Sequence, residues 1–115
     1  MFEDIFSSIY ENNNEIKCIG VWGKDGLELE RKRFSEFRLD IELIGAQLAD
    51  VLTRFETISL SSLSHVIRVD FAETTLIVFS LTKDYFMVVL ADRAIIPGKL
   101  DFYVRLYRDK LISYL

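Results

Sequence analysis

The chain has 115 residues, of which 50% are hydrophobic and 13% are aromatic. A chain of this length builds one core that buries roughly two-thirds of its unfolded surface, so a single domain over residues 1–115 is expected. Acidic residues outnumber basic residues by 18 to 14, and the formal net charge of -4 argues against nucleic acid as a partner, because clustered Lys and Arg supply most of that affinity.

Residues that build the common types of site are scarce. The only basic run covers positions 31–33, and so short a run is more typical of a solvated strand end than of a phosphate site. The single cysteine, Cys18, excludes an internal disulfide, a zinc site of several thiolates and a CxxC redox pair. No signal peptide is recognised, because Glu3, Asp4 and Glu11 interrupt the opening stretch. The apolar runs are far shorter than the ~20 residues that span a bilayer, so a cytoplasmic protein without membrane insertion is expected.

The first predicted elements are an amphipathic helix and a hairpin. Apolar side chains follow the helical period at Phe2, Ile5, Phe6, Ile9 and Tyr10. The asparagines at positions 12–14 end this helix, because Asn competes for backbone hydrogen bonds and tolerates left-handed conformations. The nearly continuous apolar run 16–22 predicts a strand covered on both faces, and the glycine-bounded segment 23–26 predicts a turn. Alternation over residues 27–32 predicts an outer strand with one face in water.

A long second helix is predicted between Asp40 and Phe55. Its apolar residues form one stripe at helical spacing: Ile41, Ile44, Leu48, Val51, Leu52 and Phe55. At a rise of 1.5 Å per residue the helix is about 24 Å long, which is enough to lie across a whole sheet face. A serine-rich connector follows, with Ser59, Ser61, Ser62 and Ser64.

Three closely spaced strands are predicted next. Residues 65–71 alternate between polar and apolar, whereas residues 74–81 and 85–91 are mostly apolar and rich in β-branched or aromatic side chains. The turns at 72–73 and 83–84 are too short for crossover connections, so the three strands form an antiparallel meander.

Pro97 and Gly98 introduce a last helix, because proline is tolerated in a first helical turn. Its inner stripe is Leu100, Tyr103, Val104, Tyr107, Leu111 and Tyr114. The element order is therefore α-β-β-α-β-β-β-α. The predicted fold class is α/β in a layered α+β arrangement: an antiparallel five-stranded sheet with the long helix on one face and the N- and C-terminal helices on the other.

Catalytic chemistry is not indicated. His65 is the only histidine, and no Cys or Ser stands at a spacing that would make it part of a nucleophile–base pair. The five glycines form neither GxxxxGK[ST] nor GxGxxG, the loops that hold phosphates. Glu28 and Glu30 stand on a strand, whereas Ca²⁺ and Mg²⁺ sites need several oxygens that converge within one loop. The sequence therefore predicts a protein that is not an enzyme, with no catalytic residue, no cofactor and no metal.

Several short motifs, in their order along nearly the whole chain, resemble the roadblock/LC7 family. They are the strand 16–22, the turn Lys24-Asp25-Gly26 with Leu27 after it, the stretch Lys83-Asp84-Tyr85-Phe86 that leads into Met87-Val88-Val89-Leu90, and Ile96-Pro97-Gly98-Lys99-Leu100 at the entry to the last helix. The opening helix and the long second helix complete the match. The full-length C-terminal helix is similar to prokaryotic members, especially the MglB type, rather than to the shorter dynein light chains.

This resemblance implies a homodimer that acts as a platform for a small Ras-like GTPase, which MglB-type members regulate. It also places the third strand at the edge of the sheet, where unpaired N–H and C=O groups invite another chain. Self-pairing of that strand about a two-fold axis would join two sheets and set the second helices side by side.

The second helix gives a separate reason to expect a dimer. Beside its core stripe stand Gly45 and Ala49, and small residues at i and i+4 would let another helix come close. The alternative is a helix surface that happens to be small, because Ala is simply a good helix former. The predicted interface residues are Glu42, Gly45, Ala46, Ala49, Thr53, Glu56, Val66, Arg68 and Asp70.

Other functions remain open at this point. A scaffold or motor light-chain-like adaptor would use the same dimer but would have no effect on GTP turnover. A small-molecule sensor of PAS or profilin-like architecture would need a cavity with convergent polar groups, whereas the apolar stripes look sufficient to fill the core.

Overall fold

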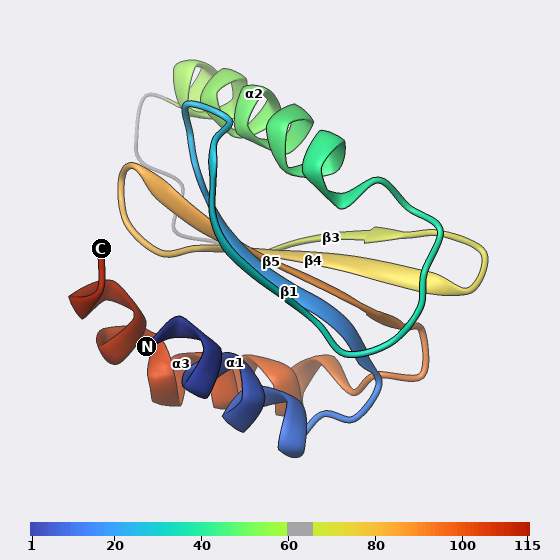
Figure 1. Ribbon diagram of the computed structural model, residues 1–115. Helices are drawn as coiled ribbons and strands as arrows, with labels where there is room; N and C mark the ends of the chain where they lie inside the picture. Colours follow the sequence, from blue (N-terminus) through green and yellow to red (C-terminus); the bar gives the residue numbers. More distant parts are fainter. Residues whose placement is uncertain (60–65) are drawn as a thin grey trace.

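The computed structural model describes residues 1–59 and 66–115. Within these residues the chain forms helices and strands in the order α-β-β-α-β-β-β-α, as the sequence predicts (Figure 1). The elements are α1 Phe2–Glu11, β1 Ile16–Gly23, β2 Glu28–Arg33, α2 Ile41–Ser59, β3 Val66–Asp70, β4 Thr74–Ser80, β5 Tyr85–Asp92 and α3 Pro97–Ser113.

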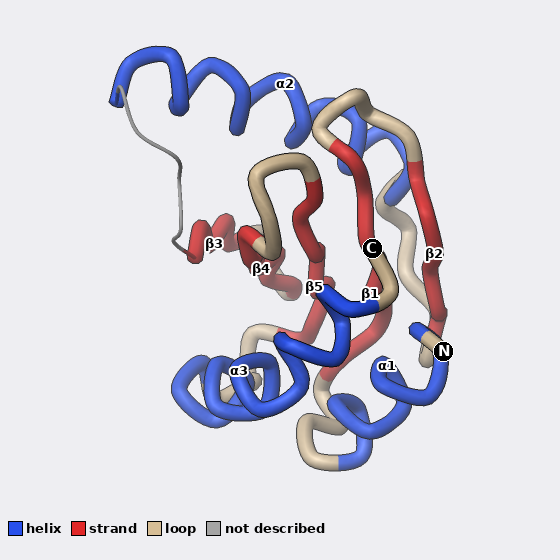
Figure 2. The backbone as a smooth tube through the Cα atoms, turned by 90° about the vertical axis from the view of Figure 1, so that its left-hand side faces the viewer, coloured by secondary structure: helices blue, strands red, loops and turns tan. Residues whose placement is uncertain are grey.

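One antiparallel five-stranded sheet organises the molecule. Its strand order is β2-β1-β5-β4-β3, which makes β2 and β3 the edges and β5 the central strand. Helix α2 covers one face, whereas α1 and α3 lie beside each other on the opposite face (Figure 1, Figure 2). The predicted fold class and the predicted division of helices between the two faces are confirmed.

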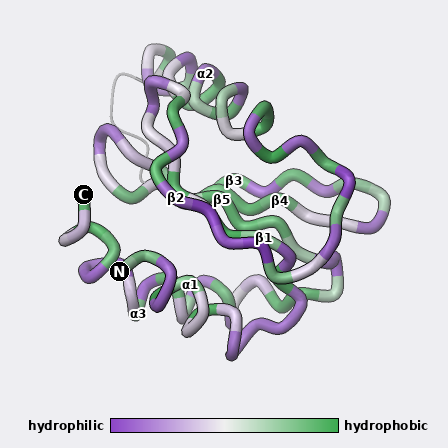
Figure 3. Tube along the Cα trace, viewed as in Figure 1, coloured by the Kyte–Doolittle hydropathy of each residue, from purple (hydrophilic) through white to green (hydrophobic). Residues whose placement is uncertain are grey.

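Each face of the sheet carries its own hydrophobic core. Strands β1, β4 and β5 are buried on both faces, so their successive side chains enter opposite cores. The core beneath α1 and α3 includes Phe6, Ile19, Ile77, Val89, Leu100 and Leu111. The core beneath α2 includes Trp22, Leu52, Leu76, Phe86, Val88 and Leu90. The two cores explain why the central strands are continuously hydrophobic while the edge strand β2 is hydrophilic (Figure 3).

The ends of the helices follow from local chemistry. Asn13 is buried after α1, and its side-chain amide donates to the carbonyl of Ile9 at 2.9 Å. The same carbonyl also accepts the backbone N–H of Asn12 at 3.3 Å, so the side chain of Asn13 adds a second donor at the end of α1. Pro97 is the first residue of α3, where its missing N–H has no helical partner to lose.

The stripe predicted for α2 is confirmed at four positions and wrong at two. Ile41 and Leu52 are buried in the core beneath α2, and Ile44 and Leu48 pack against it. Val51 and Phe55, predicted to lie in the core, are 40% and 45% exposed, whereas Ala49, predicted to lie beside it, is 2% exposed. Small residues also belong to the inner face, because the indole of Trp22 fills the space beneath the helix at Gly45 and leaves no room for a side chain there.

One predicted helix boundary and the predicted exposure of β2 also differ in the structure. Helix α2 continues through Ser59, which was predicted to begin the connector, while Ser61, Ser62, Ser64 and His65 lie outside the described residues. On β2 the pairing with β1 shifts register between Val21 and Trp22. Leu29 is the extra residue of this bulge. Strand β2 is also exposed on both faces instead of one.

Candidate partner-binding surface

Helix α2 keeps an apolar flank at the protein surface. Its members, Ile44, Leu48, Val51, Phe55 and Ile58, are spaced by four, three, four and three residues. That is the a/d pattern of a heptad repeat, which is typical of a helix that packs along another helix. Ile44 and Leu48 lie partly buried against the core beneath α2, and the exposed fraction is larger at Val51, Phe55 and Ile58.

Strand β3 adds apolar surface on the same face of the sheet. Val69 pairs with Leu76, a member of the core beneath α2, so the side chain of Val69 points to the α2 side. Val69 and Phe71 are 38% and 39% exposed. We call Val51, Phe55, Ile58, Val69 and Phe71 together the α2–β3 surface. Monomeric soluble proteins seldom expose much apolar surface, so these exposed side chains on one face of the sheet favour a binding surface.

The edge position of β3 provides backbone groups next to this surface. Only β4 pairs with β3 among the described residues, so alternate N–H and C=O groups of β3 point away from the sheet. Strand β2, at the other edge, is dense in charged side chains, a device that discourages pairing with another chain. The two edges therefore differ, and β3 is the one suited to extension of the sheet.

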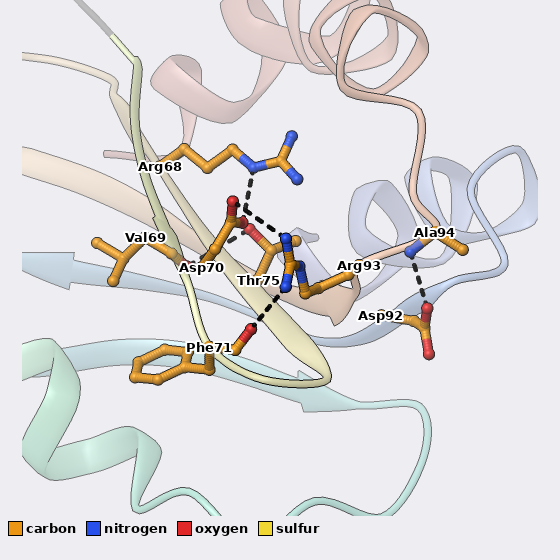
Figure 4. Close-up of polar contacts among 8 residues, drawn as sticks. All are labelled: Arg68, Val69, Asp70, Phe71, Thr75, Asp92, Arg93 and Ala94. Atoms are coloured by element: carbon orange, nitrogen blue, oxygen red, sulfur yellow. Dashed lines mark hydrogen bonds and ion pairs between the residues drawn. The ribbon is translucent and has the colours of Figure 1, made fainter.

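The opposite side of β3 is charged and ordered (Figure 4). Arg68 donates from Nε to Oδ1 of Asp70 at 2.9 Å, and Nη2 of Arg93, after β5, lies 3.9 Å from Oδ2 of the same carboxylate. Arg93 also donates to the carbonyl of Phe71 at 3.4 Å. A hydrogen bond with Thr75, followed by the hydrogen bond from Arg68, lowers the pKa of Asp70. Asp70 therefore stays ionised and fixed between two guanidinium groups.

The predicted β3 residues lie together on this charged side. Val66, Arg68 and Asp70 alternate with Ile67 and Val69, so all three side chains point toward the α3 face at an exposed edge. The structure places these three residues side by side along one face of β3. Their role in an interface stays a prediction.

The predicted α2 residues lie on a different flank, which faces the β1–β2 hairpin. Glu42 pairs with Arg31 of β2 at 3.5 Å, and Glu56 pairs with Lys24 in the hairpin turn. The Cα of Ala46 lies 3.9 Å from the position that a Cβ would take at Gly26 of the same turn. The six residues on or beside this flank are Glu42, Gly45, Ala46, Ala49, Thr53 and Glu56.

Gly45 and Ala49 are buried within the chain itself. The prediction that their small size leaves room for a second helix is therefore wrong, because their size instead lets α2 approach its own sheet. The heptad spacing of the opposite flank was the signal that could have identified the exposed side from sequence.

The basic run on β2 is neutralised by acidic residues of the same chain. The pairs are Arg31 with Glu28 and Glu42, Lys32 with Glu3, and Arg33 with Glu36. Arg33 also lies over the ring of Phe37, 4.1 Å from its centroid. These pairs support the interpretation of the run as a strand end rather than a phosphate site.

Other kinds of site have little support in residues 1–59 and 66–115. No group of three or more His, Cys, Asp or Glu side chains there could hold a metal ion. Burial raises the pKa of the Cys18 thiol to about 11, which disfavours the reactive thiolate. None of the helices in this part of the chain is long and apolar enough to cross a membrane.

No protein-family model and no curated protein matches the sequence, whereas solved structures match the fold. A roadblock/LC7 domain from Streptomyces avermitilis superposes with a TM-score of 0.78 at 14% identity, over 94% of this chain and 92% of that one. The chain has the roadblock/LC7 fold.

Two MglB proteins share this roadblock/LC7 fold. Myxococcus xanthus MglB gives a TM-score of 0.77 at 13% identity, over 99% of this chain and 98% of that one. The gliding protein MglB of Thermus thermophilus gives 0.76 at 9% identity, over 90% and 79%. At such identities the likeness concerns the fold, and it agrees with the resemblance to prokaryotic roadblock/LC7 members.

Proposed function

We propose that this protein is a non-enzymatic homodimer that serves as a platform to bind and regulate a small Ras-like GTPase. The observation that carries the proposal is the α2–β3 surface beside an edge strand. Exposed apolar side chains of α2 and β3 lie on the same face of the sheet, the β3 edge of that sheet carries free backbone groups, and one self-complementary contact would cover both.

Such a contact has a simple geometry. A two-fold axis perpendicular to the sheet would pair β3 with β3 of a second copy in antiparallel orientation and extend the sheet. The same axis would set the two α2 helices on one face, with the heptad-spaced flanks of Val51 and Phe55 toward each other. The outcome is a continuous two-helix layer that a globular partner could contact.

The choice of a Ras-like GTPase as the partner rests on the resemblance to MglB-type members. The charge of the chain suits a protein partner, since the net charge is -4 and the basic run of β2 is already paired. The two-helix layer would be the contact area for the GTPase. In this role the platform itself needs no nucleotide-binding loop, which agrees with the glycine pattern of the sequence.

Sedimentation equilibrium tests the homodimer. The wild type should sediment with twice the mass of the 13.4 kDa chain. Phe55→Glu should yield a folded monomer at micromolar concentration, because burying an unpaired carboxylate costs several kcal/mol. Thr57→Glu adds the same charge to the exposed opposite side of α2 and should leave the dimer intact. A monomeric wild type would contradict the proposal.

Single-turnover kinetics test the regulatory role. A Ras-like GTPase encoded beside this protein should hydrolyse GTP, or release its nucleotide, at a changed rate when the platform is added. Phe55→Glu should abolish the change, because it separates the two α2 helices that form the proposed contact area. Absence of any binding to the GTPase would remove this part of the proposal.

An adaptor without effect on turnover is the second candidate, because it would use the same α2–β3 surface. Binding of the GTPase at an unchanged rate of hydrolysis and of nucleotide release would favour the adaptor over the regulator.

A further inference from the structure

We infer that two β3 strands pair about a two-fold axis that passes through Val69, so that Arg68 of each copy lies opposite Asp70 of the other. The inference rests on the homodimer proposed above, and it adds the register of the contact and the residues that make β3 recognise itself. Three features of β3 lead to it: the direction of its backbone groups, the order of its charges and the position of its apolar side chains.

The direction of the backbone groups comes from the β3–β4 hairpin. The N–H of Phe71 donates to the carbonyl of Thr74 at 2.8 Å, so the backbone N–H of Phe71 points toward β4. Hydrogen-bonded and non-hydrogen-bonded pairs alternate along an antiparallel ladder. Ile67 and Val69 therefore also direct their backbone groups to β4, whereas Val66, Arg68 and Asp70 direct theirs to the open edge.

A two-fold axis perpendicular to the sheet allows few registers. Paired residues of an antiparallel ladder point to the same face, and a two-fold axis perpendicular to the sheet keeps each side chain on its own face. One residue must therefore stand opposite its own copy, and we call this residue the centre of the register. Within Val66–Asp70 the possible centres with more than one overlapping pair are Ile67, Arg68 and Val69. Each centre joins outward-facing backbone groups, and the side chains decide among the three.

The charges favour Val69. In this register Arg68 of one copy stands directly opposite Asp70 of the other, and symmetry repeats the pair. Each Arg68 already donates to Asp70 of its own chain at 2.9 Å, so positive and negative groups alternate across the seam. An axis through Arg68 would instead place two guanidinium groups opposite each other, and like charges in that position destabilise a sheet. An axis through Ile67 would place Arg68 opposite Val66 and leave Asp70 outside the pairs formed within Val66–Asp70.

The apolar side chains on the α2 face favour the same centre. Val69 would meet Val69 of the second copy as a non-hydrogen-bonded pair, the type in which side chains approach most closely. Phe71 would lie opposite Ile67 of the second copy, an aromatic and β-branched pair that stabilises sheets. Val69 and Phe71, the residue that follows β3, are then both covered on this face.

A cysteine scan along β3 tests the register in the intact protein. Only a residue on the axis meets its own copy within the ~4.4–6.8 Å Cα separation that a disulfide requires. In a Cys18→Ala background, Val69→Cys should form a covalent dimer on mild oxidation, whereas Ile67→Cys and Arg68→Cys should not. Circular dichroism verifies that each variant is folded.

The outcomes separate the register from the dimer itself. A dimeric protein that crosslinks at position 67 or 68, or at none of the three positions, would overturn the Val69 centre and leave the homodimer standing. A wild type that sediments as a monomer would overturn both.

A charge exchange gives a second readout that needs no cysteine. Arg68→Asp and Asp70→Arg should each weaken dimerisation about tenfold or more, since two attractive cross-strand pairs become repulsive. The double variant restores opposite charges and should return the dissociation constant to within about threefold of the wild type. Single variants without effect, or a double variant without rescue, would contradict the inference.

Discussion

Gly45 of α2 lies directly over the indole ring of Trp22 in β1. A Cβ atom at position 45 would lie 2.7 Å from Cδ1 of this ring and closer still to Nε1 and Cε2. On the other side of the ring, a Cβ at Gly20 would lie 2.5 Å from Cζ3. Because neither Gly45 nor Gly20 has a side chain, the indole of Trp22 fits against both residues and α2 can approach the sheet closely.

Gly45→Ala should therefore lower the free energy of unfolding by about 1–3 kcal/mol, the usual cost of adding atoms to a packed core. Gly98→Ala is the matched control, because nothing lies within 4 Å of a Cβ at that position in α3. It should be neutral or stabilise by up to about 1 kcal/mol, since alanine loses less backbone entropy in a helix. Urea denaturation of both variants measures the difference.

Ala49→Glu should unfold the protein rather than separate two copies. Ala49 is buried in the core beneath α2, so the new carboxylate would lose its hydration without gaining a partner. We expect a loss of several kcal/mol in the free energy of unfolding. Circular dichroism and thermal melting decide the matter, and a folded monomer of normal stability would show that Ala49 faces outward.

Arg108→Met should loosen α3. The guanidinium of Arg108 donates to the carbonyls of Ser80 and Leu81 at 2.6 and 2.8 Å, and so joins α3 to the end of β4. Loss of these charge-assisted bonds should cost about 1–3 kcal/mol. Arg105→Met removes a more exposed arginine that pairs with Asp101, and its effect should stay within about 0.5 kcal/mol. Equal effects of the two substitutions in urea denaturation would contradict this assignment.

Asp70 should contribute to the pH dependence of stability. The pKa of its carboxyl is lowered in the folded chain, so its contribution is present above the ordinary pKa of Asp and is lost as the pH falls through the lowered value. The difference in stability between wild type and Asp70→Asn should therefore be largest near neutral pH and shrink on acidification. Thermal melting between neutral and strongly acidic pH measures it, and a difference that grows on acidification would refute it.

The layering of this fold could be predicted from sequence because it follows periodicity. The helical spacing of α1 and α3 and the unbroken apolar runs of β1 and β5 each report whether an element is covered on one face or two. These are local signals, and they gave the correct order of elements and the correct sheet.

The orientation of α2 could not be predicted in the same way. It depends on Trp22, more than twenty residues away, whose ring leaves no room for a side chain at position 45 beneath the helix. Large apolar residues therefore stand on both sides of the helix, since Leu52 is buried whereas Val51 and Phe55 are exposed. The bulge of β2 likewise depends on pairing with β1, which no local pattern within residues 27–32 records.

The burial of Trp22 between Gly20 and Gly45 also gives the chain an optical reporter. It is the only tryptophan, it is 1% exposed, and its ring touches both the sheet and the helix that carries the α2–β3 surface. Its emission spectrum therefore reads the docking of α2 without any label. Partner binding that leaves α2 in place keeps the emission of a buried indole, whereas binding that lifts α2 admits water to the ring and shifts the emission to longer wavelength.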